Sequence, residues 1–312
     1  MARISEFRYS TKWYGKVINA TLTLVVFALL AAVTISSFLV YRIVSPAQSR
    51  SDINTRGFPG HPDVFSFSVP GVGGREGWFF PGLRTAPTVI LCHGYQSHRG
   101  ELLTLVTALQ DHQYNVLVFD FAAHGASSGH TTLGYRETLE LRAAIDAVAR
   151  RDDVDRSRFG LWGANIGGYA VIAAAAVEPR VRAVVADSVY DEPAEMVGLQ
   201  VERSGLGGLP LVERLARQGF TWLNHSYQHE SSLSQLVPRL AGVAKLFISS
   251  SDEPELARST RELFVRSPEP REQVILARGN YAGMLDDEKR RYENRIVSFF
   301  LLHLPPSGHP HR

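Results

Sequence analysis

The segment Leu161–Ala170, LWGANIGGYA, places Asn165 between glycines in a pattern that predicts a strand, a tight turn and a helix. When a serine stands at the centre of such a G-x-S-x-G turn, its hydroxyl is presented as a nucleophile. The amide of Asn165 offers no comparable nucleophile. Asparagine tolerates a positive φ better than most residues, so it suits the turn. We therefore expect Asn165 to preserve the conformation of the turn but to supply no nucleophile.

The segments around this turn alternate between apolar runs and helical patterns. Two half-buried runs, 64–69 and 77–80, flank a glycine-rich turn and predict an antiparallel pair. The alternation that follows predicts the α/β class, with a mostly parallel central sheet and helices on both faces. The remaining expected strands are 89–92, 115–119, 159–162, 181–186, 244–248 and 273–277, and expected helices include 100–110, 136–150 and about 285–302.

The stretch from about residue 189 to residue 240 interrupts this alternation with a glycine cluster and a second apolar pattern. Ligands of open α/β sheets bind beyond the carboxyl ends of the strands. We therefore expect this stretch to form a small helical lid above that edge. Four of its side chains form either the lid core or an exposed patch for lipid or a partner, namely Leu211, Leu215, Phe220 and Trp222.

Three further segments carry a family resemblance. The strand-then-His-Gly segment reads ILCHGYQSHRG, the Asp-x-Arg-Gly-His-Gly-x-Ser-like segment reads VFDFAAHGASSG, and the central turn reads GANIGG. In this order and at these separations they resemble the α/β-hydrolase superfamily, from Val64 to His303. The likeness is strongest to its serine-aminopeptidase-like and single-pass membrane esterase-like members, which implies the α/β-hydrolase fold.

The resemblance also implies where a serine, an acid and a histidine would stand. The serine position is Asn165. The acid position, in SSSDEP, is Glu253, next to Asp252, and the histidine position, in RGNYAG, is Tyr281. A phenol, whose pKa is about 10, is a poor general base near neutral pH. Two of the three positions therefore lack the group that acyl transfer needs, which predicts a pseudoenzyme.

The resemblance implies that an anion site can survive this loss. In the superfamily, backbone N–H groups form the oxyanion hole, and here they would be those of Tyr95 and Ile166. The helix that begins near Ile166 would add its positive N-terminal end. We expect this pocket either to bind a small carboxylate or acyl ligand without turnover, or to be filled by Tyr281, Tyr95 and lid side chains.

Two functions therefore stay open at this point. In the first, the chain is a binding module or an accessory, structural subunit of a membrane complex. In the second, it is an active serine hydrolase of the esterase, lipase or peptidase type with a non-standard constellation. That constellation would use Ser188 or Ser251 together with Glu253.

The first residues of the chain predict a membrane anchor. Residues 17–41 contain no charged residue and are mostly apolar, and about 20 such residues span a bilayer as a helix. The alternatives are a cleaved signal peptide, with Ser45-Pro46-Ala47 as the cleavage site, and a buried core helix. Residues 42–63 read as a linker, and residues 304–312 as a C-terminal tail.

Flanking charges set the expected orientation. Four basic residues precede residue 17, whereas Arg42 and Arg50 follow the apolar segment. The positive-inside rule then puts residues 1–16 in the cytoplasm and the globular domain outside it, in the periplasm if the cell is Gram-negative. The near-exclusive use of arginine over lysine is typical of a GC-rich bacterial genome.

Composition excludes several other classes. The net charge is +2, with no basic run that would suit a nucleic acid. Cys92 is the only cysteine, so the chain has no internal disulfide and no cysteine-based zinc site. His225 and His229 have no carboxylate at ligand spacing, and we expect no metal and no cofactor. The expected partners are the membrane, a membrane protein, or the small ligand.

Overall fold

The computed structural model describes residues 2–47, 62–227 and 231–306. Its contacts divide the chain into two compact units. One, called here the helical unit, contains Met1–Ile43 and Val197–His225; the other, the sheet unit, contains Val44–Met196 and Ser226–Arg312. Part of the expected linker (48–61), part of the expected tail (307–312) and His229 lie outside the described residues.

The sheet unit contains the predicted mostly parallel sheet. Its strand order is β1-β2-β4-β3-β5-β6-β7-β8, with β1, β2 and β4 paired antiparallel and all later neighbours parallel. The α/β class predicted from the alternating pattern is thereby confirmed. The strands are β1 (Asp63–Val69), β2 (Gly73–Phe80), β3 (Thr88–Cys92), β4 (Asn115–Phe119), β5 (Phe159–Ala164), β6 (Val181–Asp187), β7 (Ala244–Ser250) and β8 (Arg271–Leu276).

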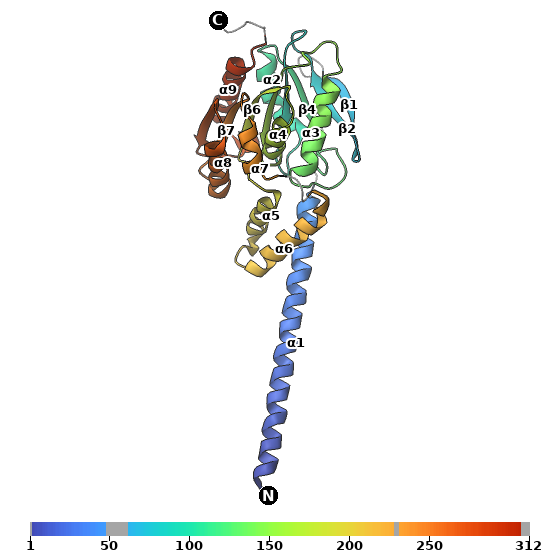
Figure 1. Cartoon of the computed structure of the whole chain (residues 1–312), viewed down its shortest axis with the longest axis vertical. Coiled ribbons are helices and arrows are strands. Elements are labelled where there is room, and N and C mark those ends of the chain that lie inside the picture. Colours follow the sequence, from blue (N-terminus) through green and yellow to red (C-terminus); the bar gives the residue numbers. More distant parts are fainter. Residues whose placement is uncertain (1, 48–61, 228–230, 307–312) are drawn as a thin grey trace. The chain divides into compact units, whose positions relative to one another are not determined.

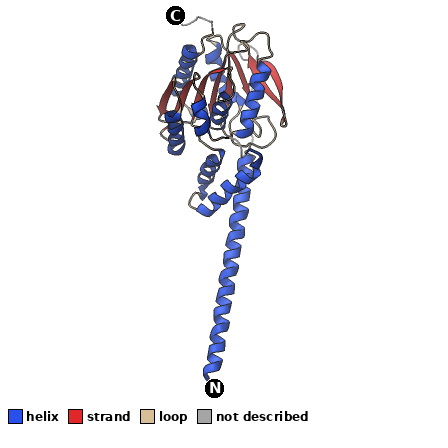
Figure 2. Cartoon of the chain, in the orientation of Figure 1, coloured by secondary structure: helices blue, strands red, loops and turns tan. Residues whose placement is uncertain are grey.

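Helices cover both faces of this sheet (Figures 1 and 2). Because side chains alternate along a strand, neighbouring residues of one strand pack against different helices. Leu246 of β7 joins the core formed with α2 and α9, whereas Phe247 packs on Phe264 of α8, with ring centroids 6.0 Å apart. The helices of this unit are α2 (Leu103–Gln110), α3 (Tyr135–Val148), α4 (Ile166–Ala175), α7 (Leu233–Leu236), α8 (Pro254–Arg266) and α9 (Asp286–His303).

Strand β2 begins earlier than expected. The glycine-rich residues 73–76 were predicted to form a turn, but Gly73 pairs with Val69 and opens the strand. The turn is shortened to the three residues between them, and Val72 N–H donates to the Val69 carbonyl. Backbone pairing needs no side chain, so glycines adjoining a tight hairpin enter the ladder.

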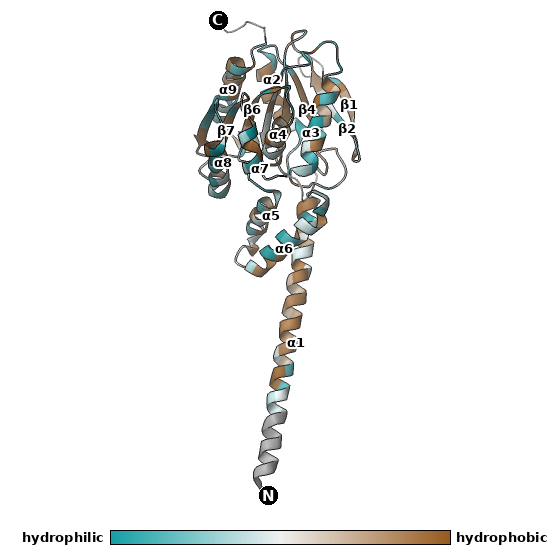
Figure 3. Cartoon of the chain, viewed as in Figure 1, coloured by the Kyte–Doolittle hydropathy of each residue, from teal (hydrophilic) through white to brown (hydrophobic). Residues whose placement is uncertain are grey.

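The helical unit is built from α1 (Ala2–Val44) and α6 (Pro210–Leu223), with the end of α5 (Pro193–Val201). Helix α1 extends beyond the predicted 17–41 in both directions and ends two residues before Pro46, where a proline disfavours helix continuation. Residues 42–44, expected in the linker, are therefore helical. Its part Trp13–Val44 is long and apolar enough to cross a membrane, a test that signal sequences near an N-terminus also pass (Figure 3).

The stretch 189–240 is largely helical, as expected, because α5, α6, α7 and short turns occupy it. Its role as a lid above the site stays a prediction. Among the four apolar residues singled out in the sequence, Phe220 is buried, Leu215 is half-buried, and Leu211 and Trp222 are exposed. The set thus contains both buried and exposed members, and its roles in a lid core or in a patch for lipid or a partner stay predictions.

Candidate functional site

The turn at Asn165 has the strained backbone that its sequence predicts. Strand β5 ends at Ala164 and α4 begins at Ile166, so one residue reverses the chain, with φ 47° and ψ −107°. The flanking glycines are sterically required. A β-carbon at Gly163 would lie 2.3 Å from the Gly167 carbonyl carbon, and one at Gly167 would lie 2.3 Å from the Cys92 carbonyl oxygen. The predicted positive φ at Asn165 is confirmed.

The side chain of Asn165 is held by its neighbours. Its backbone N–H donates to the Asp187 carbonyl at 3.0 Å, which continues the pairing of β5 with β6. Its Nδ2 donates to the Ser188 carbonyl at 3.1 Å. Its Oδ1 lies beside Gly94, where a β-carbon would come within 3.2 Å of it. The amide therefore acts as a structural bridge between the ends of β5 and β6.

A polar network continues from Ser188 into the core. Ser188 Oγ donates to Asp187 Oδ1 at 2.8 Å, and Tyr292 Oη donates to Asp187 Oδ2 at 2.5 Å. Trp162 Nε1 in turn donates to Tyr292 Oη at 3.2 Å. Neither Asp187 nor Tyr292 is recognisable from the sequence, because they lie 105 residues apart and neither belongs to a motif.

Burial dominates the electrostatics of this network. It raises the pKa of Asp187 to about 7, against the hydrogen bonds from Tyr292 and Ser188, which lower it. The negative charge of Glu253 also raises the Asp187 pKa. The ends of β5, β6 and β7 thus bring together Asn165, the Asp187–Ser188 pair and the predicted acid position, Glu253.

Tyr281, the predicted histidine position, belongs to a different environment. It is 6% exposed and lies in the core shared by α2 and α9, with its ring centroid 5.7 Å from that of Trp162. Its hydroxyl donates to Glu293 Oε1 at 2.6 Å and shares a 2.9 Å hydrogen bond with Thr104 Oγ1. Burial and the Glu293 hydrogen bond raise its pKa above the ordinary 10, so the phenol is no proton acceptor near neutral pH.

Two buried imidazoles lie next to the predicted oxyanion segment. His93 Nε2 accepts from Phe121 N–H at 3.0 Å, and its Nδ1 lies 2.8 Å from the Gly94 carbonyl, which fixes a neutral ring. Burial lowers the pKa of His93 to about 3 and lowers that of His124 as well. His124 Nε2 is buried without a hydrogen-bond partner. Both rings are therefore neutral, and they pack beside the predicted oxyanion segment around Gly94 and Tyr95.

The other predicted site residues occupy distinct positions. Ile166 is buried and supplies the first N–H of α4, which has no acceptor within its own helix. Tyr95 packs its ring 5.8 Å from that of His124. Ser251 is exposed, whereas Ser188 is buried and, like Asn165, has a positive φ of 51°. The oxyanion role of Tyr95 and Ile166 stays a prediction.

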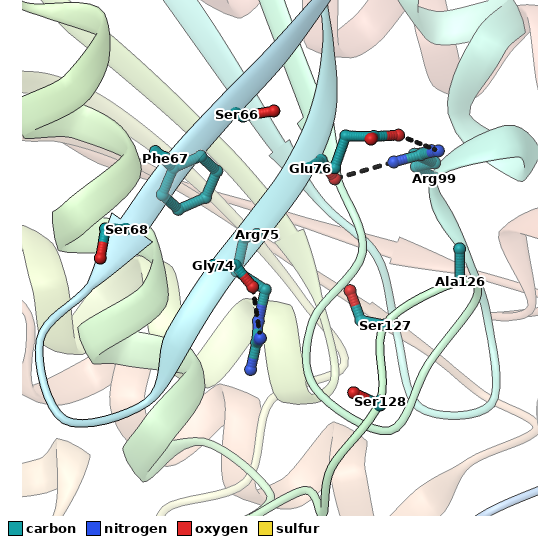
Figure 4. A pocket seen from close by; sticks show the side chains of 10 residues that line it. All are labelled: Ser66, Phe67, Ser68, Gly74, Arg75, Glu76, Arg99, Ala126, Ser127 and Ser128. Atoms are coloured by element: carbon teal, nitrogen blue, oxygen red, sulfur yellow. Dashed lines mark hydrogen bonds and ion pairs between the residues drawn. The ribbon is translucent and has the colours of Figure 1, made fainter.

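Two described cavities of the sheet unit lie elsewhere. One, of about 550 Å³, is lined by residues of β1, β2 and the 126–128 loop (Figure 4). Its arginines already have acidic partners, because Arg99 pairs with Glu76 and Arg75 with Glu140. The other, of about 150 Å³, lies between α3 and α4. Neither is lined by Asn165, and the described residues hold no cluster of three metal-ligating side chains.

Comparisons with known proteins agree with this architecture. A family model described as the alpha/beta hydrolase fold matches residues 87–248. The Escherichia coli K12 protein named "Uncharacterized protein YfhR" is 25% identical over 244 residues, which cover 75% of this chain and 78% of that protein. The esterase Pf2001 of Pyrococcus furiosus superposes with a TM-score of 0.65 at 18% identity, over 85% of this chain and 98% of that one. A dienelactone hydrolase of Anabaena variabilis superposes with a TM-score of 0.53 at 17% identity, over 78% and 99%.

Proposed function

The chain belongs to the α/β-hydrolase family, and from that premise we propose that it is a membrane-anchored pseudoenzyme. It serves as a binding module or accessory subunit at the membrane and does not hydrolyse acyl bonds by a serine mechanism. Its ligand is a small carboxylate or acyl compound bound near the N-terminus of α4, or a membrane-protein partner.

The observation that carries this proposal is the bonding of Asn165. A nucleophile must be free to attack and must lie next to a base. The Asn165 amide instead donates to the Ser188 carbonyl, and its acidic neighbour Asp187 is bonded to two hydroxyls. At the histidine position, the Tyr281 hydroxyl is engaged by Glu293 and Thr104. The side chains of Asn165 and Tyr281 are thus both engaged in structural hydrogen bonds, at positions where an active hydrolase would have a nucleophile and a base.

The membrane part of the proposal rests on α1. Its uncharged residues 17–41 extend about 37 Å at 1.5 Å per residue, which exceeds the hydrocarbon core of a bilayer. Charge asymmetry favours a cytoplasmic N-terminus and an extracytoplasmic sheet unit. Protease protection of the intact chain in oriented membranes tests this: digestion from the outside should remove the sheet unit and spare the N-terminus.

An active-site probe tests the loss of catalysis. We expect the full chain in mild detergent neither to react with a fluorophosphonate nor to hydrolyse a chromogenic short-chain ester. We expect Asn165→Ser to remain inactive too, because it supplies a hydroxyl without a base. Adding Tyr281→His tests that reason, and we expect no activity, since the side chain at 281 contacts Thr104 and Glu293. Turnover by the wild type would overturn the proposal.

A second candidate, an active hydrolase that uses Ser188, is favoured by one observation. Ser188 has a positive φ and donates to a carboxyl whose pKa burial raises to about 7, within the range of a general base. Its burial argues against access to substrate. Labelling of the wild type that disappears in Ser188→Ala but persists in Ser251→Ala would establish this candidate.

A further inference from the structure

Helix α6 has an apolar face that is only half covered. On a helical projection at 100° per residue, its apolar side chains fill one side and its polar side chains the other. Val212, Ala216 and Phe220 are buried, whereas Leu211 is 46% exposed and Trp222 is 76% exposed. The exposed apolar residues on this face and at the two ends of α6 are Leu209, Leu211, Trp222 and Leu223.

The covered half of this face shows where α6 lies along α1. Ser36 Oγ of α1 donates to the Val212 carbonyl of α6 at 3.0 Å. One turn further along α1, Val40 faces Gly219, where a β-carbon would lie 3.8 Å from Val40 Cγ2. Figure 1 shows α6 crossing α1 near its C-terminal end. The contacts of α1 with α6 thus include Ser36 and Val40, near the C-terminal end of α1.

The same position follows from the thickness of a membrane. About 20 helical residues cross the hydrocarbon core, and counting from Val17, just after Lys16, ends at Ser36. Exposed aromatic residues give an independent measure. From Trp13 to Tyr41 the helix rises about 42 Å, which matches the full bilayer with its headgroups. Trp and Tyr concentrate at such interfaces.

We propose that α6 is an interfacial helix that lies on the leaflet at the C-terminal end of α1, with Leu211 and Trp222 in contact with lipid. The inference rests on the proposed membrane anchoring of α1. A bilayer is the occupant that the contacts favour, because α6 is bonded to the spanning helix at the depth where the hydrocarbon core ends. The polar face of α6, including Arg214 and Gln218, then faces water and headgroups.

With α6 in this position, the helical unit contacts the membrane twice, through the spanning part of α1 and through the exposed apolar side chains of α6. Ser36 and Val40 are buried and contact α6, whereas every residue of α1 from Trp13 to Ala31 is exposed. An apolar helix exposed all round is typical of a lipid-facing segment. Residues 197–225, which lie in the sequence between the two segments of the sheet unit, thus return to the membrane surface.

Fluorescence quenching by lipid tests the inference. Single cysteines at positions 222, 221 and 27 of the full chain receive a fluorophore, with the unmodified chain as a labelling control, since Cys92 is buried. The chains are reconstituted in phosphatidylcholine vesicles that carry a nitroxide near the headgroup end or the middle of the acyl chain. Thr221→Cys is the matched control, because Thr221 is an exposed neighbour of Trp222 on the polar face.

We expect the label of Trp222→Cys to be quenched by the shallow nitroxide at least about twofold more than that of Thr221→Cys. The label of Phe27→Cys should be quenched by the deep nitroxide. No quenching at 27 would refute the anchoring itself. Quenching at 27 with equal or absent quenching at 222 and 221 would refute only the interfacial helix. A spectral shift at 222 without quenching would show a protein covering the patch, and would also refute it.

Discussion

Two turns of the sheet unit stand where the resemblance places a serine and a histidine, and they differ in what holds their residues in place. At Asn165 the backbone still has the strained reversal, and the two glycines still clear the neighbouring carbonyls. At Tyr281 the side chain is part of the core, bonded to α2 through Thr104 and to α9 through Glu293.

The difference is between a turn whose geometry is independent of its central side chain and a turn whose side chain is part of the core. At the first turn, backbone geometry is set by strand pairing and glycine packing, which do not depend on the central side chain. At the second turn, the side chain itself fills space and satisfies polar partners. A serine introduced at 165 should therefore leave the fold in place, whereas a histidine introduced at 281 should leave the hydrogen bonds to Thr104 and Glu293 unmet.

The largest effect should come from the backbone of the first turn. Gly167→Ala would put a β-carbon 2.3 Å from the Cys92 carbonyl oxygen and 2.7 Å from that of His93. Because both belong to fixed backbone, we expect a loss of more than about 3 kcal/mol in the free energy of unfolding. Urea denaturation of the full chain in detergent measures it.

Gly74→Ala is the matched control, because nothing lies within 4 Å of its β-carbon position. We expect it to change stability by less than about 1 kcal/mol. Equal effects of the two variants would show that the turn is not sterically determined.

The next effect concerns pH and the network between the two turns. Burial raises the folded-state pKa of Asp187 from 3.8 to about 7, so the folded chain holds this proton more tightly than the unfolded chain. With respect to Asp187, the fold is most stable below pH 4, where this residue is protonated in both the folded and the unfolded chain. This advantage is lost as the pH rises to about 7, because the buried carboxyl must then ionise. Between pH 5 and pH 7 we expect Asp187 to cost about 2 kcal/mol of stability.

Glu140 adds to the same slope, since burial raises its pKa to about 7 as well. Asp187→Asn should therefore flatten the pH dependence of the urea midpoint in part. Asp252→Asn, the same change at an exposed residue, should leave the wild-type slope. An unchanged slope in Asp187→Asn would contradict the burial argument.

A smaller effect is expected from the second turn. Tyr281→Phe removes the hydroxyl and leaves Glu293 Oε1 and Thr104 Oγ1 without that partner. We expect a loss of about 1–2 kcal/mol, because the ring still packs while two polar groups lose a hydrogen bond. Tyr227→Phe, at a half-buried tyrosine for which no hydroxyl hydrogen bond is described, is the control. A neutral Tyr281→Phe would mean that this hydroxyl does not serve the fold.

The sequence supports prediction of the first turn far better than of its surroundings. The strand, the glycines and the positive φ at Asn165 are local properties that short-range sterics determine. The network of Asp187, Tyr292 and Trp162 is not local, since β6, α9 and β5 supply one member each. Likewise, periodicity identifies the apolar face of α6, but which half is covered depends on its contacts with α1.

The last expected effect, similar in size to that of Tyr281→Phe, isolates the strain at Asn165. Asn165→Gly and Asn165→Ala both remove the Nδ2 hydrogen bond to the Ser188 carbonyl, so they differ in how they tolerate φ 47°. Glycine adopts this conformation freely, and alanine does not. We expect the alanine variant to be less stable than the glycine variant by about 1–2 kcal/mol.

At an ordinary helical position alanine should be more stable than glycine, the reverse of the order expected at 165. Ala143 lies within α3, where glycine is less favourable than alanine by about 1 kcal/mol, so Ala143→Gly should destabilise the chain. If alanine were as stable as glycine at 165, the turn would not be strained in solution. A serine introduced there would then no longer be presented as a nucleophile.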